Sequence, residues 1–172
     1  KQAENTVRSL MTDYHLGVDA ADYEVLIVEN ESGNHMDPQF IASLPPEFSY
    51  HLRKEDQPTP IHAINYGIER SSGENVCVMI DGAGLMTPGV VKNILLGPKI
   101  SDLAVGTVPG YHLGRELQQK AVGSGYDENT EKELMDSIGW PENGYQLFDI
   151  ACFSGSCAQG FYLPHSESNC IS

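Results

Sequence analysis

Two acidic residues stand where strand-like runs end, and their positions predict a shared ligand-binding edge. Glu29 follows the apolar run 23–28, and Asp81 follows the apolar run 75–80. Ligands of open parallel sheets bind beyond the carboxyl ends of the strands, where loop amides and helix N-termini converge. A carboxylate there can accept hydrogen bonds from ribose hydroxyls or coordinate a hard cation. The simpler alternative is that each acid ends its strand and faces water.

Glycines surround the second of these acids, while several other catalytic motifs are absent from the sequence. Gly82 and Gly84 flank Ala83, so a ligand can approach the backbone closely at this point. The chain has no G-x-G-x-x-G, no G-x-x-x-x-G-K-[ST] and no H-E-x-x-H motif. The segment 154–158 lacks both glycines of a G-x-S-x-G elbow. Dinucleotide, P-loop, zinc-protease and serine-hydrolase chemistry are therefore not indicated.

Charge and length narrow the class of protein further. The 172 residues carry 10 Lys and Arg against 24 Asp and Glu, a formal net charge of -14. Such a surface disfavours binding to nucleic acid or to anionic lipid. No apolar run approaches the ~18–20 residues that a membrane-spanning helix needs. Length and a 40% hydrophobic content predict one globular domain over residues 1–172.

The four cysteines predict reduced, structural thiols and a cytoplasmic location. They form no C-x-x-C pair and no zinc-binding spacing with histidine. Cys77 lies inside an apolar, strand-like run, and we expect it to be buried.

The elements that must position the two acids follow from hydrophobic periodicity and turn signals. Apolar residues three and four apart indicate helices, and β-branched runs bounded by polar turns indicate strands. The expected helices cover 2–14, 38–44, 61–70, 87–96 and 130–138, and the expected strands cover 23–28, 48–52, 75–80 and 103–108. This alternation predicts an α/β fold with a mostly parallel central sheet flanked by helices.

Four segments in order resemble the inverting glycosyltransferases of family 2. They are Asn5 to Leu10 with Tyr23 to Ser32, then Ile61 to Ile68, then Gly73 to Ala83, and finally Thr87 to Val90. The last three are similar to the family's A-x-N-x-G-I helix, its D-x-D strand and its Pro-led helix. The resemblance covers about half of the chain and implies a GT-A fold. Residues 1–110 would form the nucleotide-sugar-binding half, and residues 111–172 an acceptor-side subdomain.

The resemblance also implies a set of donor-binding residues. Glu29 or its neighbour Asn30 would contact the nucleoside, and Asn65 would support the donor pocket. Asp81, the first acid of the D-x-D-like motif, would hold the ribose and a diphosphate-bound metal, with Gly82 beside it.

The sequence departs from the family pattern in three places. Ala83 replaces the second acid of D-x-D, so Mn²⁺ or Mg²⁺ would depend on Asp81, the diphosphate and water. The family's first strand is expected before Asn5, which indicates missing residues at that end. The candidate catalytic base is Glu167, with a residue beyond Ser172 as the alternative.

We therefore expect transfer of a sugar from a nucleotide-sugar donor to an acceptor hydroxyl, with inversion at the anomeric carbon. The main alternative is a GT-A-like module that binds a saccharide or a partner protein without catalysis. A nucleotidyltransferase is a third alternative, disfavoured because no Gly-rich, Lys-containing phosphate loop is present. The sequence does not specify the sugar, the acceptor or the oligomeric state.

Overall fold

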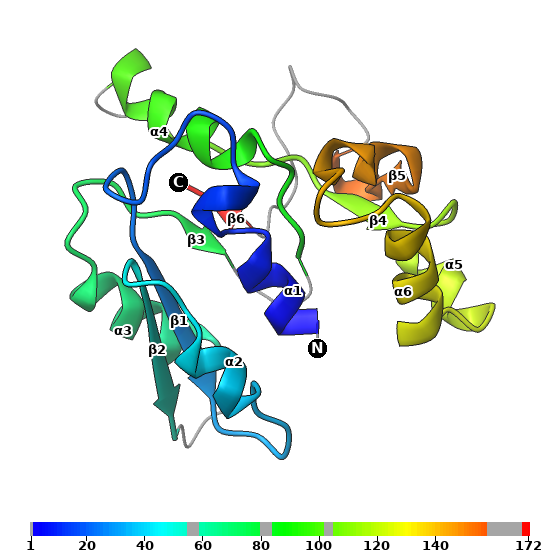
Figure 1. The fold of residues 1–172 in the computed structure, drawn as a ribbon, viewed down its shortest axis with the longest axis horizontal. Coiled ribbons are helices and arrows are strands. Elements are labelled where there is room, and N and C mark those ends of the chain that lie inside the picture. Colours follow the sequence, from blue (N-terminus) through cyan, green and yellow to red (C-terminus); the bar gives the residue numbers. More distant parts are fainter. Residues whose placement is uncertain (1, 55–58, 80–83, 102–104, 158–169) are drawn as a thin grey trace.

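The computed structural model describes residues 2–54, 59–79, 84–101, 105–157 and 170–172. Asp81, Gly82, Ala83 and Glu167 lie outside these residues. The described part is a mixed α/β structure with short strands (Figure 1). Its helices are α1 (Gln2–Arg8), α2 (Pro38–Ala42), α3 (Ile61–Arg70), α4 (Val90–Ile100), α5 (Gln118–Gly123) and α6 (Glu128–Ser137). Its strands are β1 (Val25–Asn30), β2 (Phe48–Arg53), β3 (Val78–Met79), β4 (Tyr111–Leu113), β5 (Ala151–Phe153) and β6 (Cys170–Ile171). Three 3₁₀ turns complete it, at Thr12–Tyr14, Gly144–Asp149 and Gly155–Cys157.

Strands β1 and β2 form a parallel pair that organises the N-terminal half. Val25 pairs with Phe48, and the register continues to Asn30 opposite Arg53. Side chains alternate between the two faces of a strand, so the odd-numbered residues of β1 share one face with the even-numbered residues of β2. Both strands match the sequence prediction to within two residues.

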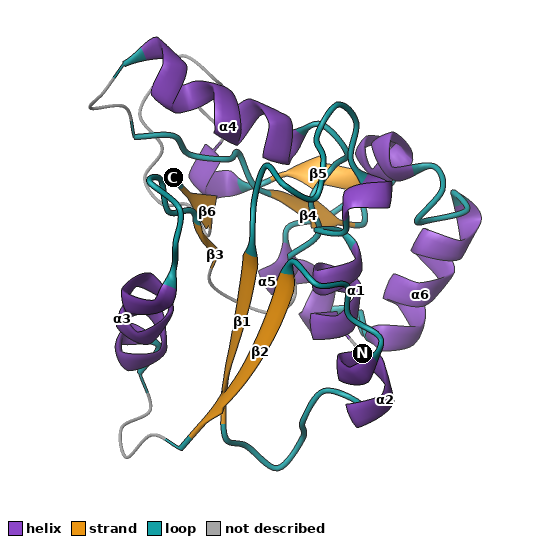
Figure 2. Cartoon of the chain, turned by 60° about the vertical axis from the view of Figure 1, so that its left-hand side comes forward, coloured by secondary structure: helices purple, strands orange, loops and turns teal. Residues whose placement is uncertain are grey.

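One face of this pair packs against α1 and α2 and forms the core (Figure 2). Val7 from α1, Met36 and Phe48 are buried at its centre, surrounded by partly buried apolar side chains. Helix α2 begins where predicted because Asp37 caps it, accepting a hydrogen bond from the Gln39 amide at 2.7 Å, with Pro38 in the first turn.

Helix α3 covers the other face of the pair, next to β1 (Figure 2). The sequence predicts its bounds correctly. Ala63 is buried, whereas Ile61 and Ile68 are 58% and 44% exposed. Helix α3 packs directly on β1 at Gly67, where an added Cβ would make an ordinary contact of 3.6 Å with Cγ2 of Val28.

Two predicted helices end or begin differently in the structure. Helix α1 stops at Arg8, and the predicted apolar stripe to Tyr14 continues only as a 3₁₀ turn. Helix α4 begins at Val90, three residues after the start predicted at Thr87. Helix α6 confirms its prediction, since the Asp127 carboxylate accepts a hydrogen bond from the Thr130 amide at 2.9 Å.

The expectation of a mostly parallel sheet is wrong for the part of the chain that the structure describes. There, β1 and β2 are the only parallel pair, while β3–β6 and β4–β5 are antiparallel pairs. The predicted strand 75–80 is reduced to Val78–Met79 in its described part, because its only described partner strand, β6, is two residues long. Residues 105–108 are the described part of the predicted strand 103–108, and among them only Thr107 forms a bridge, with Ile171. Cys77, expected to be buried, is exposed.

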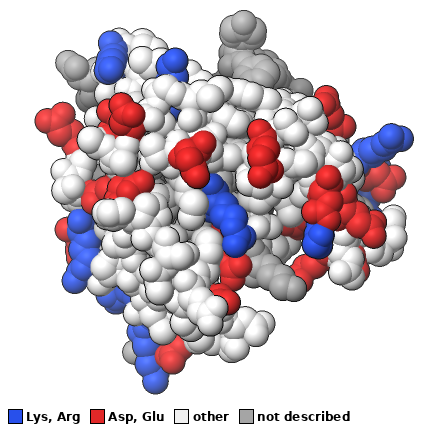
Figure 3. Space-filling model, in the orientation of Figure 1, with Lys and Arg blue, Asp and Glu red and all other residues white. Residues whose placement is uncertain are grey.

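Charged side chains are scattered over the face shown in Figure 3, with Lys and Arg lying among the more numerous Asp and Glu. Among the described residues, no helix combines the length and the apolar character required to cross a bilayer.

Candidate functional site

The carboxyl end of β1 carries two of the predicted site residues, Glu29 and Asn30, on opposite faces of the strand. Consecutive side chains of a strand point to opposite sides. Glu29 shares the face of Val25 and Ile27, which pack against the core beneath α1 and α2. Asn30 shares the face of Val28, which lies against α3. The two residues therefore belong to different environments.

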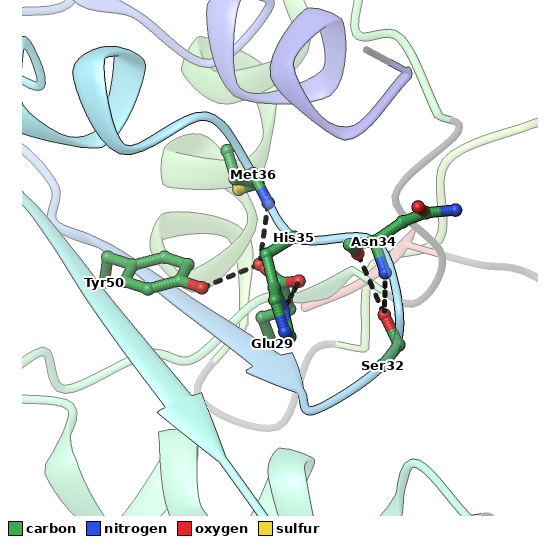
Figure 4. Close-up of polar contacts among 6 residues, drawn as sticks. All are labelled: Glu29, Ser32, Asn34, His35, Met36 and Tyr50. Carbon is green, nitrogen blue, oxygen red and sulfur yellow. Dashed lines mark hydrogen bonds and ion pairs between the residues drawn. The ribbon is translucent and has the colours of Figure 1, made fainter.

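Both oxygens of the Glu29 carboxylate are bound by groups of the protein (Figure 4). Oε1 lies 3.0 Å from Nδ1 of His35. Oε2 accepts a hydrogen bond from the Tyr50 hydroxyl at 2.8 Å and a longer one from the Met36 amide at 3.4 Å. Only 18% of the Glu29 side chain is exposed. Glu29 thus ties the loop after β1 to strand β2.

The pKa of the Tyr50 hydroxyl is raised by its surroundings. Burial, the hydrogen bond to the Glu29 carboxylate and the charge of that carboxylate together raise the pKa of Tyr50 to about 12, with burial as the largest cause. A phenolate beside this carboxylate is unfavourable, so Tyr50 remains a hydrogen-bond donor at neutral pH. A ligand that used Glu29 would have to displace one of these donors.

A groove of about 270 Å³ opens on the other side of β1, between this strand, α3 and the segment 75–79. The groove is lined by alternate residues of β1, by one side of α3 and by the whole of 75–79. Strand β1 contributes Leu26, Val28 and Asn30, and helix α3 contributes Ala63, Ile64, Gly67 and Ile68. Ligand sites typically occupy about 300–1,000 Å³. The groove is therefore suited to a group the size of a nucleoside, not to a complete sugar nucleotide.

Asn30 is the polar residue of β1 that lines this groove. Its Oδ1 is buried and has no hydrogen-bond partner within the described part of the chain. Leaving a buried carbonyl unpaired costs about 1–3 kcal/mol, so native structures rarely do so without a reason. The site thus offers an amide next to an apolar wall.

The structure brings Asn30 to the groove but does not bring the other described candidates there. Glu29 faces the opposite side of the sheet, and Asn65 is exposed on α3 and is not part of the groove lining. Asp81 follows groove residue Met79 by two positions in the sequence, and it lies outside the described residues together with Gly82, Ala83 and Glu167.

The described residues include no cluster of three His, Cys, Asp or Glu that could bind a metal ion. The predicted metal ligand Asp81 lies outside these described residues.

Sequence reasoning missed Tyr50 and His35, the two side chains that hold Glu29. Tyr50 could have been found from the predicted parallel pairing, because the observed register places it opposite Ile27, on the same face as Glu29. His35 approaches Glu29 through the loop between β1 and α2, and no periodic pattern in the sequence signals that contact.

Comparison of the chain with family models, with curated proteins and with solved structures finds no match.

Proposed function

We propose that the protein is a GT-A-like glycosyltransferase that binds the nucleoside part of a nucleotide sugar in the groove beside β1. The observation that supports this proposal most directly is the position of Asn30. It lies at the carboxyl end of a parallel strand, lines the groove and holds a buried Oδ1 that has no hydrogen-bond partner among the described residues. The carboxyl ends of parallel strands are where such folds bind nucleotides.

The shape and lining of the groove support a nucleoside as the bound group. The apolar side chains Leu26, Val28 and Ile64 offer a surface for a base or ribose ring, and the Asn30 amide can both donate and accept hydrogen bonds. Segment 75–79, which forms the opposite wall, leads directly into Asp81. The four ordered segments that resemble family 2 include both β1 and this wall.

The proposed reaction is an in-line displacement at the anomeric carbon of the donor. A carboxylate, with Glu167 as the candidate, removes the proton from the acceptor hydroxyl as it attacks. Asp81 helps to hold the donor so that the nucleoside diphosphate departs on the opposite side. The departing oxygen carries the negative charge away with the nucleoside diphosphate.

Binding is tested by titration calorimetry with UDP, GDP and their sugar derivatives, with and without Mn²⁺. Asn30→Val is expected to weaken binding at least tenfold. Asn34→Ala is the matched control, because the exposed side chain of Asn34 extends away from Glu29 and its hydrogen bonds to the Ser32 hydroxyl use only the backbone atoms of Asn34 (Figure 4). Equal binding by the two variants would contradict the assignment of the groove.

A second candidate function is binding of the same ligand without catalysis. The sequence favours it, since Ala83 stands where the second acid of D-x-D is expected. The variant Asp81→Ala separates the two functions. If the protein is an enzyme, the wild type hydrolyses the donor and transfers the sugar, and Asp81→Ala abolishes both activities. If it is a binding module, neither the wild type nor the variant turns over the donor.

A further inference from the structure

Two cysteines 93 positions apart in the sequence meet where strands β3 and β6 pair. Met79 pairs with Cys170 and Val78 with Ile171 in this antiparallel ladder. Because side chains alternate, Cys77 shares a face with Met79 and is therefore the diagonal neighbour of Cys170. Their sulfur atoms are 3.5 Å apart.

The two thiols differ in their access to solvent. Cys77 is exposed on the wall of the groove, whereas Cys170 is buried, with 6% of its surface exposed. The hydrogen bond from Cys170 lowers the pKa of the Cys77 thiol, and the same contact together with burial raises the pKa of Cys170. Cys77 is therefore the thiolate that a reagent in solution can reach, since thiolates are the reactive form.

We propose that Cys77 and Cys170 form a reversible intramolecular disulfide, in which Cys77 attacks the oxidant and Cys170 resolves the intermediate. The oxidant is a low-molecular-weight disulfide such as oxidised glutathione. The Cys77 thiolate, having lost its proton to solvent, attacks one sulfur of this disulfide and releases one glutathione thiolate, which takes up a proton. Cys170 then attacks the Cys77 sulfur, and its proton passes to the second departing glutathione. One disulfide is reduced to two thiols while two protein thiols are oxidised to one disulfide.

The surrounding structure holds Cys170 in place for this second step. Strand β6 pairs with β3 on one side and with the segment 106–108 on the other. The Val108 amide donates to the Cys170 carbonyl at 3.1 Å, and Gly106 exchanges two backbone hydrogen bonds with Ser172. Since a disulfide has a sulfur–sulfur distance of about 2.05 Å, the sulfurs must approach by about 1.5 Å. The bond would then fix β6 to the wall of the groove.

The test treats the 172-residue chain with oxidised glutathione, blocks the remaining thiols with N-ethylmaleimide and analyses the product by intact-mass and peptide mass spectrometry. We expect loss of two alkylatable thiols, a cross-linked peptide pair containing Cys77 and Cys170, and full reversal by dithiothreitol. Oxidation is also expected to raise Tm by about 5–10 °C, because it closes a long loop in the unfolded chain.

Single-residue variants separate the attacking role of Cys77 from the resolving role of Cys170. Cys170→Ser is expected to retain glutathione on Cys77, and Cys77→Ser to form neither the adduct nor the cross-link. Cys152→Ser is the matched control, because Cys152 lies on β5, in a different strand pair, and this variant is expected to oxidise like the wild type. A wild-type chain that keeps both thiols alkylatable, or that holds a stable glutathione adduct on Cys77, would overturn the proposal.

Discussion

Replacing Asn30 with valine is expected to stabilise the fold and to weaken nucleotide binding at least tenfold in the same variant. The buried Oδ1 of Asn30 has no partner among the described groups, and an unpaired buried carbonyl costs about 1–3 kcal/mol. Valine removes this atom, and as a β-branched residue it suits a strand position. We expect a gain of about 1–2 kcal/mol in the free energy of unfolding, which for a chain of this length is a rise in Tm of about 3–6 °C.

The assays are urea unfolding followed by circular dichroism and the nucleotide titration described above. Asn30→Asp is the control at the same position, since a carboxylate buried there is expected to destabilise the fold at neutral pH. Burial would raise the pKa of the new carboxyl, so the lost stability returns as the pH is lowered. A valine variant less stable than the wild type would refute the statement that Oδ1 lacks a partner. A valine variant that is more stable but binds nucleotide normally would refute the role of Asn30 in the groove.

Three further predictions concern packing and titration. Gly144→Ala is expected to destabilise the fold by about 2–3 kcal/mol in urea unfolding, because an added Cβ would lie 2.7 Å from Cζ of Tyr14. Gly67→Ala is the control, because a Cβ in the middle of α3 makes only an ordinary contact. This variant should be neutral or stabilising by up to about 1 kcal/mol. Burial lowers the pKa of His15 in the folded protein below the ordinary value of 6.5. Between the folded and the unfolded pKa the unfolded chain binds more protons, so the urea midpoint should fall as the pH drops below 6.5. A His15→Gln variant whose urea midpoint falls with pH as steeply as that of the wild type would contradict this. Tyr50 should ionise near pH 12 in an ultraviolet titration, at a higher pH than an ordinary tyrosine. Its contribution to the free energy of unfolding is therefore lost as the pH rises from 10 toward 12. A change in tyrosinate absorbance that is complete by pH 11 would be inconsistent with the contact between Tyr50 and a carboxylate.

The sequence predicted those elements whose signals are local. Helix α3 appears at its predicted bounds, and α2 and α6 begin next to the acidic caps Asp37 and Asp127. A cap and a first turn involve residues two or three positions apart, so neighbouring residues contain the whole signal. Strand 75–80 is the opposite case, because an apolar run does not reveal whether a partner strand of equal length exists.

The candidate site was predicted in part for the same reason. The sequence placed Glu29 and Asn30 at the end of a strand, and in the structure Asn30 lines a groove at the end of β1. The sequence could not show that Glu29 would be engaged by Tyr50 from β2 and by His35, since those contacts depend on the pairing of two strands and on a loop conformation.

By itself, the amino-acid sequence determined the acidic character of the chain, its α/β class, and the helices and strands whose capping and periodicity are complete within about ten residues. Alternation along β1 also required Glu29 and Asn30 to face opposite sides. Only the tertiary structure decided which side is the core and which is the groove, because that depends on α1 and α2 packing on one face and α3 on the other. The meeting of Cys77 with Cys170 is also a tertiary result, since chain segments so distant are brought together by packing and not by any local preference.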